Sequence, residues 1–210
     1  DHYQQSLKIK EELGDVAHMA TSLSNIGILQ QKRGSYDEAL DYYQRALKIY
    51  EEIGDMAGMA LSLRDIGIVR GLRGNYDEAL DYYQRSLKIR EDFGDVAGVA
   101  ESLNNIGLLQ KTRGNYDEAL DYYQQSLKIK KEIGNVAGVA LSQAQIGKLL
   151  RETGRYAEAF ELLLNALGIF IELQSPNARI VVNNLKTLRG KWDGFDAAWR
   201  EATGADVPEW

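Results

Sequence analysis

Residues 36–44 read Tyr-Asp-Glu-Ala-Leu-Asp-Tyr-Tyr-Gln, and the same nine residues return at 76–84 and again at 116–124. The offset is 40 residues each time, without a gap. A second stretch, Asn-Ile-Gly at 25–27, returns three more times at the same offset, with only its first residue varied. Self-similarity at a fixed period of this length is typical of proteins in which one supersecondary unit stacks on copies of itself.

Each unit has the pattern of two helices. In the first complete unit we expect them at 16–33 and 36–53, where apolar residues recur at spacings of three and four. An N-cap acceptor precedes the first helix of each unit, at Asp15, Asp55, Asp95 and Asn135. Glycines suited to the left-handed conformation follow the helices, at Gly14, Gly34, Gly54, Gly74, Gly94, Gly114, Gly134 and Gly154. The short turns between these helices predict that paired helices are antiparallel neighbours.

Two local features of the unit lead to more specific predictions. The stretch Ser35-Tyr36-Asp37-Glu38 has the pattern of a capping box, in which Glu38 accepts a hydrogen bond from the Ser35 amide. Gly27 lies inside the first helix, where glycine costs roughly 1 kcal/mol relative to alanine. Because a glycine stands there in four units, we predict a close approach of another side chain, with Tyr43 of the second helix as the expected neighbour.

These residues resemble the tetratricopeptide repeat, whose signature positions are occupied by Leu23, Ile26-Gly27, Gln30, Ala39 and Tyr43. The sequence departs from that family in two ways. The unit is longer than the usual 34 residues, and the closing proline is replaced by Glu51, Glu91 and Lys131. The resemblance implies an all-α fold, a right-handed α-solenoid of antiparallel helix pairs. Long units of this kind are similar to those of cell-polarity adaptors and bacterial signalling proteins.

The register assigns the whole chain to one array. Residues 1–15 are expected to form the second helix of a truncated repeat, since they match the end of the next unit. Full repeats are expected at 16–55, 56–95, 96–135 and 136–175, and a degenerate capping repeat at 176–210. The first residue is Asp1 rather than Met, which indicates a fragment of a longer protein.

The end of the array needs a cover for its apolar face. The segment Leu162–Leu173 is apolar almost all round, so another element has to pack over it. Trp192, Trp199 and the last helix are the candidates for this cap. Ser175-Pro176 is expected to start the preceding helix, with the proline at its first position.

Composition and charge exclude several classes of function. The 210 residues include no cysteine, so there is no disulfide framework and no thiolate metal site. The net charge of −6 lacks the basic surplus of a general nucleic-acid binder. The most apolar stretch is too short to span a membrane, and no leader sequence is recognisable. We therefore expect a cytoplasmic protein without nucleic-acid or membrane partners.

The sequence offers no constellation for catalysis. The two histidines, His2 and His18, are not close in repeat register, and no nucleophile elbow, phosphate-binding loop or metal-ligand spacing occurs. The Asp-Glu pair recurs at the same place in three units, whereas a catalytic dyad is needed only once. We predict no enzyme activity, no catalytic residue, no metal and no cofactor.

Positions where the units differ indicate a binding surface, because positions that hold the stack together should agree. On the first helix the variable positions lie four and three residues apart, so they share one face. The family resemblance implies that this face lines a concave groove, whose amides bond to the backbone of an extended ligand. The predicted groove residues are Ser24, Asn25, Ile28, Gln31, Arg64, Asp65, Ile68, Asn104, Asn105, Leu108, Lys111, Gln145, Lys148 and Arg151. At the variable positions the second and fourth units also carry Gly71 and Ala144.

Basic side chains surround the apolar floor of the predicted groove. The floor is Ile28, Ile68 and Leu108, whereas the outer helices carry the repeated acidic residues. The surrounding basic residues are Arg64, Lys111, Lys148 and Arg151. This segregation predicts a preference for acidic peptides, mainly through faster encounter and rejection of basic competitors. The alternative, in which these basic residues are solvated surface residues, is equally compatible with the sequence.

The leading interpretation is a protein-interaction scaffold that holds an extended peptide or a partner helix in its groove. One alternative is an oligomerisation or architectural segment of a larger signalling protein. Another is a regulatory sensor that closes on a short peptide. Self-association would use the N-terminal helix, in which Leu7, Ile9 and Leu13 have no preceding helix to cover them.

Overall fold

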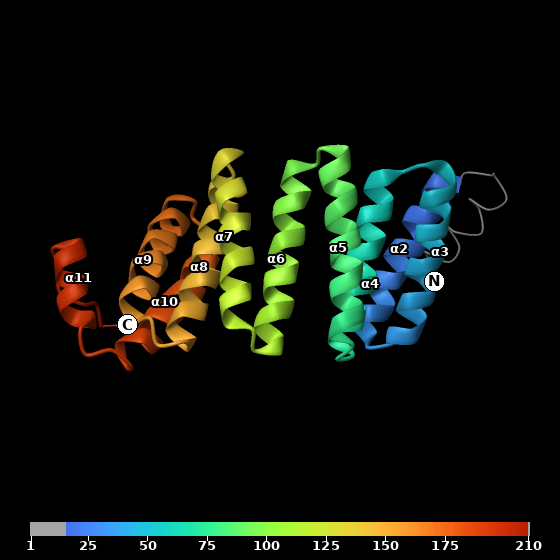
Figure 1. Ribbon diagram of the computed structural model, residues 1–210. Coiled ribbons are helices and arrows are strands. Elements are labelled where there is room, and N and C mark those ends of the chain that lie inside the picture. Colours follow the sequence, from blue (N-terminus) through green and yellow to red (C-terminus); the bar gives the residue numbers. More distant parts are fainter. Residues whose placement is uncertain (1–15, 210) are drawn as a thin grey trace. The chain divides into compact units, whose positions relative to one another are not determined.

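The computed structural model describes residues 16–209. Over that range the only regular secondary structure is helical, and no strand occurs (Figure 1). The helices are α2 (Val16–Arg33), α3 (Tyr36–Ile53), α4 (Met56–Leu72), α5 (Tyr76–Phe93), α6 (Val96–Arg113), α7 (Tyr116–Glu132), α8 (Val136–Glu152), α9 (Tyr156–Glu172), α10 (Asn177–Arg189) and α11 (Phe195–Thr203). The predicted all-α class and the expected helices at 16–33 and 36–53 are confirmed. The predictions for Asp15, Gly14 and the N-terminal helix lie outside the described residues.

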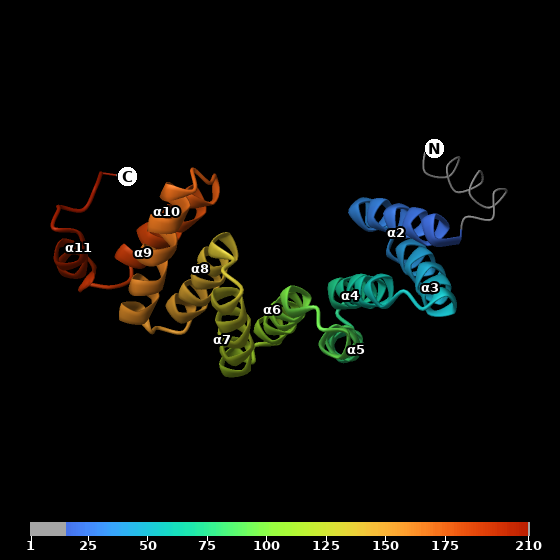
Figure 2. The ribbon, with the colours of Figure 1, turned by 90° about the horizontal axis from the view of Figure 1, so that it is seen from above.

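The chain forms two compact units, Asp1–Arg113 and Gly114–Trp210. In the described part of the first unit, α2 packs against α3 and α4 against α5, while α3–α4 and α5–α6 contacts join successive pairs. In the second unit, α7 packs against α8, α8 against α9, and α9 against α10. Figure 2 shows these neighbours from above. Each unit is therefore built from helices that pack on their neighbours in sequence.

Glycine turns end the helices as predicted. Gly54 has φ 70°, and its amide donates to the Glu51 carbonyl oxygen at 3.3 Å. The Asp55 amide donates to the Tyr50 carbonyl oxygen at 2.9 Å. These two bonds form a Schellman motif, which needs a left-handed residue and so favours glycine. The next helix starts at once, because Asp55 Oδ1 accepts a hydrogen bond from the Gly58 amide at 2.9 Å.

The predicted capping box at the start of α3 is wrong. The Ser35 side chain makes no capping hydrogen bond, and the Glu38 carboxylate is bonded instead to the Gln30 side chain of α2. The reason is that the Ser35 amide already donates to the Gln30 carbonyl oxygen at 2.9 Å, within the glycine turn. An amide that is satisfied by the turn leaves nothing for the Glu38 carboxylate to cap, so the carboxylate bonds to the neighbouring helix.

The glycine inside the first helix of a repeat packs against the second helix, as predicted. A Cβ atom on Gly27 would lie 2.6 Å from the Tyr43 ring, and one on Gly67 would lie 2.8 Å from the Tyr83 ring. Tyr43 is fully buried. The two helices of a pair can approach this closely only because these positions have no side chain.

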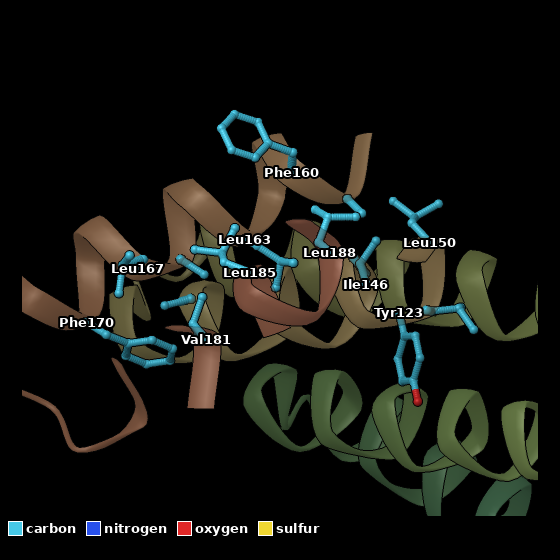
Figure 3. Packing of buried hydrophobic residues seen from close by; sticks show 14 of the residues in the cluster. Tyr123, Ile146, Leu150, Phe160, Leu163, Leu167, Phe170, Val181, Leu185 and Leu188 are labelled. Atoms are coloured by element: carbon cyan, nitrogen blue, oxygen red, sulfur yellow. The ribbon is translucent and has the colours of Figure 1, made fainter. Parts of the chain in front are cut away.

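The core of the second unit is one cluster that extends from α7 to α11 (Figure 3). Phe170, Val181 and Leu185 in this cluster are almost completely buried, so α10 covers the apolar helix α9. Beyond them, the ring of Phe160 packs edge-on against Phe195 at a centroid distance of 5.2 Å.

The two tryptophans proposed as the cover of α9 pack against Phe160 near its start, whereas α10 covers the rest of the helix. Trp199 is 7% exposed and lies 6.4 Å from the Phe160 ring, and Trp192 lies 5.9 Å from the same ring. Helix α10 begins at Asn177, so Pro176 stands just before its first residue. The expected helix start at Ser175-Pro176 is therefore correct to within one residue.

Candidate functional site

A pocket opens in the first unit, where residues of α4, α5 and α6 meet. Its volume is about 290 Å³, and its walls are mainly aliphatic and aromatic. The lining residues are Ile68, Gly71, Leu72, Tyr76, Tyr83, Asn105, Leu108, Leu109 and Thr112. Three of the predicted groove residues therefore come together here, namely Ile68, Asn105 and Leu108. A mainly apolar pocket with a single amide has the composition of a site for an apolar group next to a polar backbone.

Gly71 creates space in this pocket. In the other repeats the equivalent residues are Gln31, Lys111 and Arg151, which have long side chains. A Cβ atom on Gly71 would have no neighbour closer than 3.7 Å, the distance to Leu109 Cδ1. The missing side chain therefore leaves space at this position.

The first repeat shows what a long side chain does at this position. Gln31 Oε1 accepts a hydrogen bond from the Tyr43 hydroxyl at 2.9 Å. Gly71 has no side chain to receive the equivalent bond from Tyr83, whose ring forms part of the pocket wall. Burial raises the pKa of Tyr83 to about 12, so this wall stays uncharged at neutral pH.

Sequence comparison with known families identifies the repeat. A tetratricopeptide repeat model matches residues 1–52 and 58–132, and a second tetratricopeptide repeat model matches residues 139–173. The chain belongs to the tetratricopeptide repeat family. A sequence comparison with curated proteins finds no match.

Solved structures share the fold of this tetratricopeptide chain at low sequence identity. BtubC from P. vanneervenii has a TM-score of 0.81 and 20% identity, over 100% of this chain and 92% of the other. Aspartyl phosphate phosphatase F from Bacillus subtilis has a TM-score of 0.77 and 14% identity, over 90% of this chain and 54% of the other.

A third similar structure is a Signal Transduction ATPase with Numerous Domains from Pyrococcus horikoshii, which has a tetratricopeptide repeat sensor. Its TM-score is 0.74 at 22% identity, over 87% of this chain and 29% of the other. The predicted helical-repeat solenoid class is confirmed by these likenesses.

One of the predicted basic residues of the tetratricopeptide surface is held by a neighbouring carboxylate. Arg64 Nε and Nη2 both donate to Asp65 Oδ1, at 2.9 and 2.8 Å. Asp65 is 7% exposed, and burial raises the pKa of its carboxyl group although Arg64 opposes this effect. Arg64 therefore balances a buried negative charge within the chain, and the pair contributes little net positive charge to the surface.

The predicted residues of α2 lie outside the pocket. Ser24 and Asn25 are half-buried, whereas Ile28 is 37% exposed. Gln31 is the partner of Tyr43, as described above. On α6, Asn104 and Lys111 are half-buried, and the Oδ1 atom of Asn104 has no hydrogen-bond partner among the described residues.

In the second unit, the predicted residues of α8 have different environments. Lys148 is exposed and Gln145 is half-buried. Arg151 Nη1 donates to Asn184 Oδ1 at 3.0 Å, so this guanidinium is bonded to α10. Its Nη2 atom lies 3.9 Å from a Glu152 carboxylate oxygen. Both arginines predicted for the groove are therefore hydrogen-bonded to other residues of the chain.

Several residues that line the pocket were not predicted from the sequence. Tyr76 and Tyr83 belong to the second helix of their repeat, which the argument from variable first-helix positions did not consider. Gly71 stood at a variable position, and its small size was the signal that could have found it.

Among residues 16–209, no group of three or more His, Cys, Asp or Glu side chains could hold a metal ion. No helix in the same range combines the length and the apolar character needed to cross a bilayer.

Proposed function

We propose that this tetratricopeptide chain is a non-enzymatic protein-interaction scaffold that holds an extended peptide or a partner helix. The pocket of α4, α5 and α6 carries this proposal, because it offers an apolar cavity of about 290 Å³ on the face predicted for binding. An apolar side chain of the partner fills the cavity, and the Asn105 amide bonds to the adjacent backbone.

The chemistry of the pocket supports a ligand with one bulky apolar side chain. Interface energy is concentrated in a few buried anchor residues that fill pockets. A dry cavity of about 150 Å³ is enough for a benzene ring, so the pocket next to Gly71 has room for an aromatic or a large aliphatic group. The sensor role of the repeat in the Pyrococcus horikoshii protein is in line with ligand binding by this fold.

The proposal includes a preference of the scaffold for acidic peptide segments. Lys111 lies three residues after Leu108 on α6, and Lys148 is an exposed cation on α8. Arg64 and Arg151 contribute less, because Asp65 and Asn184 engage them. Such a preference acts on the association rate and its salt dependence more than on affinity.

The test fills the pocket with the side chain of another repeat. Peptides that bind the wild-type chain are selected from a random display library, and their affinities are measured by fluorescence anisotropy. Gly71→Gln introduces the residue found at position 31, and we expect it to weaken binding about tenfold or more, as for loss of a buried anchor contact.

The matched control is Gly168→Gln, because Gly168 is an exposed helical glycine of α9 where an added Cβ atom would meet no neighbour within 4 Å. The control should bind like the wild type. Equal affinity of all three proteins for every selected peptide would contradict the proposed pocket, and failure to select any peptide would contradict the scaffold function.

A second candidate function, self-association, is favoured by a row of exposed apolar side chains. Where one repeat of the first unit passes into the next, the turn exposes a pair of large apolar residues. They are Ile53 at 43%, Met56 at 47%, Phe93 at 55% and Val96 at 49% exposure. We name these four residues the turn edge. Apolar surface that is repeated along one edge is suited to contact with another protein surface.

The remaining sequence predictions stay proposals. The repeat boundaries at 16–55, 56–95, 96–135 and 136–175, with a cap at 176–210, describe one array. A cytoplasmic location and a peptide-sensing role within a larger signalling protein are likewise proposals, and fractionation of the source cells tests the first of these.

A further inference from the structure

The C-terminal cap of the second unit contains a second pocket, separate from the one at Gly71. It has a volume of about 350 Å³ and lies between α9, α11 and the segment that connects α10 to α11. Phe160 and Trp192 supply its aromatic surface, and Glu161 and Glu201 supply carboxylates. The remaining lining residues are Ala157, Ala198 and Ala202.

The two helices contribute to the pocket in the same way. On α9 the lining residues are Ala157, Phe160 and Glu161, and on α11 they are Ala198, Glu201 and Ala202, so each helix presents positions three and four apart. The alanines leave room between the helices. Ala157 stands where earlier repeats have Asp37, Asp77 and Asp117, so the small side chain at this position distinguishes α9 from α3, α5 and α7.

The aromatic surface belongs to a cluster of packed rings. Phe160 is 4% exposed, and its ring contacts those of Phe195, Trp199 and Trp192 at centroid distances between 5.2 and 6.4 Å. Figure 3 shows the Phe160 ring at the edge of the apolar cluster, away from Leu163 and Leu185. Trp192 is only half-buried, so part of its indole ring remains available at the pocket.

The carboxylates of this pocket have no cation to balance them. Glu161 and Glu201 are both exposed, and neither forms an ion pair with a basic group in the described part of the chain. The nearest arginines in sequence are engaged elsewhere, because Arg155 is bonded to Glu158 at 2.6 Å and Arg200 to Asp206 at 2.9 Å. No basic residue lines the pocket within residues 16–209. Negative charge beside an indole ring therefore characterises the site.

We propose that this pocket binds an arginine side chain of a partner protein. The charge complementarity is direct, because two unpaired carboxylates flank an aromatic surface that attracts cations through its π electrons. Arginine suits the site better than lysine, since a planar guanidinium stacks on an indole ring and can donate to two carboxylates at once. Its aliphatic stem packs against the alanines. This site is independent of the pocket at Gly71 and of what that pocket binds.

The experiment uses the full chain labelled with ¹⁵N and a set of capped Gly-Gly-X-Gly-Gly peptides, with X as Arg, Lys or Gln. The chain has three tryptophans, and the Trp192→Phe variant identifies the indole N–H signal of Trp192. We expect the Arg peptide to shift this signal with a dissociation constant on the order of 1 mM. The Gln peptide should leave it unchanged.

The variant Glu161→Gln with Glu201→Gln removes both carboxylates without changing side-chain size. We expect it to weaken binding of the Arg peptide about tenfold, as for the loss of charge-assisted hydrogen bonds. The matched control, Glu132→Gln with Glu172→Gln, removes the same charge from exposed positions of α7 and α9 outside the pocket. It should bind the Arg peptide like the wild type, and thermal unfolding checks that both variants fold.

Several outcomes would overturn the assignment. Equal shifts with the Arg and Gln peptides would show that no cation is recognised, and equal binding of the Lys peptide would remove the case for a guanidinium. If the two double variants weakened binding of the Arg peptide equally, the effect would come from the net charge of the chain and not from this pocket. A Trp192 signal that moves with protein concentration in the absence of peptide would assign the pocket to a second copy of the chain.

Discussion

Arg90 Nη1 donates a hydrogen bond to the Gly98 carbonyl oxygen at 2.6 Å, across the turn that joins α5 to α6. The Arg90 side chain is 3% exposed, and the same nitrogen lies 3.1 Å from a Glu101 carboxylate oxygen. The preceding repeat has Tyr50 at this position. The buried space at the turn between two repeats is thus filled in one case by a hydrogen-bonded cation and in the other by an aromatic ring.

This contact predicts how the turn tolerates substitution. Arg90→Leu removes the buried, charge-assisted hydrogen bond to the Gly98 carbonyl, and we expect a loss of about 2 kcal/mol in the free energy of unfolding. Arg90→Tyr should cost less than about 1 kcal/mol, because Tyr50 packs against Gly58 in the equivalent place. Urea denaturation measures both values. A leucine variant as stable as the tyrosine variant would show that the hydrogen bond contributes nothing.

The glycine inside the first helix predicts a second effect on stability. Gly27→Ala places a methyl group 2.6 Å from the Tyr43 ring, and we expect a loss of about 2 kcal/mol from overpacking of the core. Gly168→Ala is the control, since it lies in a helix with open space around it. It should gain up to about 1 kcal/mol from helix propensity alone. Thermal unfolding of the two variants should therefore move in opposite directions.

The buried carboxyl group of Asp65 predicts a dependence of stability on pH. Burial raises its pKa above the ordinary value of an aspartate, so the folded chain binds this proton more tightly than the unfolded chain. Deprotonation as the pH rises through that range therefore lowers the free energy of unfolding. The Asp65→Asn variant lacks this titration, and asparagine already occupies the equivalent positions 25 and 105.

We expect the stability of Asp65→Asn relative to the wild type to increase as the pH rises, and then to level off. Denaturation of both proteins from about pH 4 to about pH 8 covers the range in which such a carboxyl group titrates. A difference that stays constant over the whole range would mean that the Asp65 pKa is the same in the folded and unfolded chain.

The turn edge predicts the state of association. If the four exposed apolar residues bind a second copy, Phe93→Glu introduces a charge at its most exposed member and should abolish concentration-dependent association. Sedimentation velocity at several concentrations measures this change. The control Glu91→Gln alters charge two residues away on an exposed position. A wild-type chain that remains monomeric at every concentration would exclude the turn edge as a self-association surface.

The sequence predicts most of the fold because the determinants are local and repeated. Glycines such as Gly54 determine where helices end, and the spacing of Gly27 and Tyr43 indicates how paired helices pack. The predicted capping box is wrong because the Ser35 amide already donates its hydrogen bond within the preceding turn. The four-residue pattern carries no information about that turn. The candidate sites are predicted less completely, since Gly71 acts through an absent side chain, and Glu161 and Glu201 become neighbours only through the packing of α11.

Gly71 also distinguishes one position in a structure whose units are nearly alike. A scaffold of equivalent modules offers a linear ligand several isoenergetic alignments, each displaced by one module. Among the equivalent positions 31, 71, 111 and 151 only 71 is glycine, and a bulky group that needs the space beside it removes this degeneracy, because only one alignment places the group there. The loss of one side chain can in this way fix the direction and the starting point of a bound segment without any change in the helices that carry it.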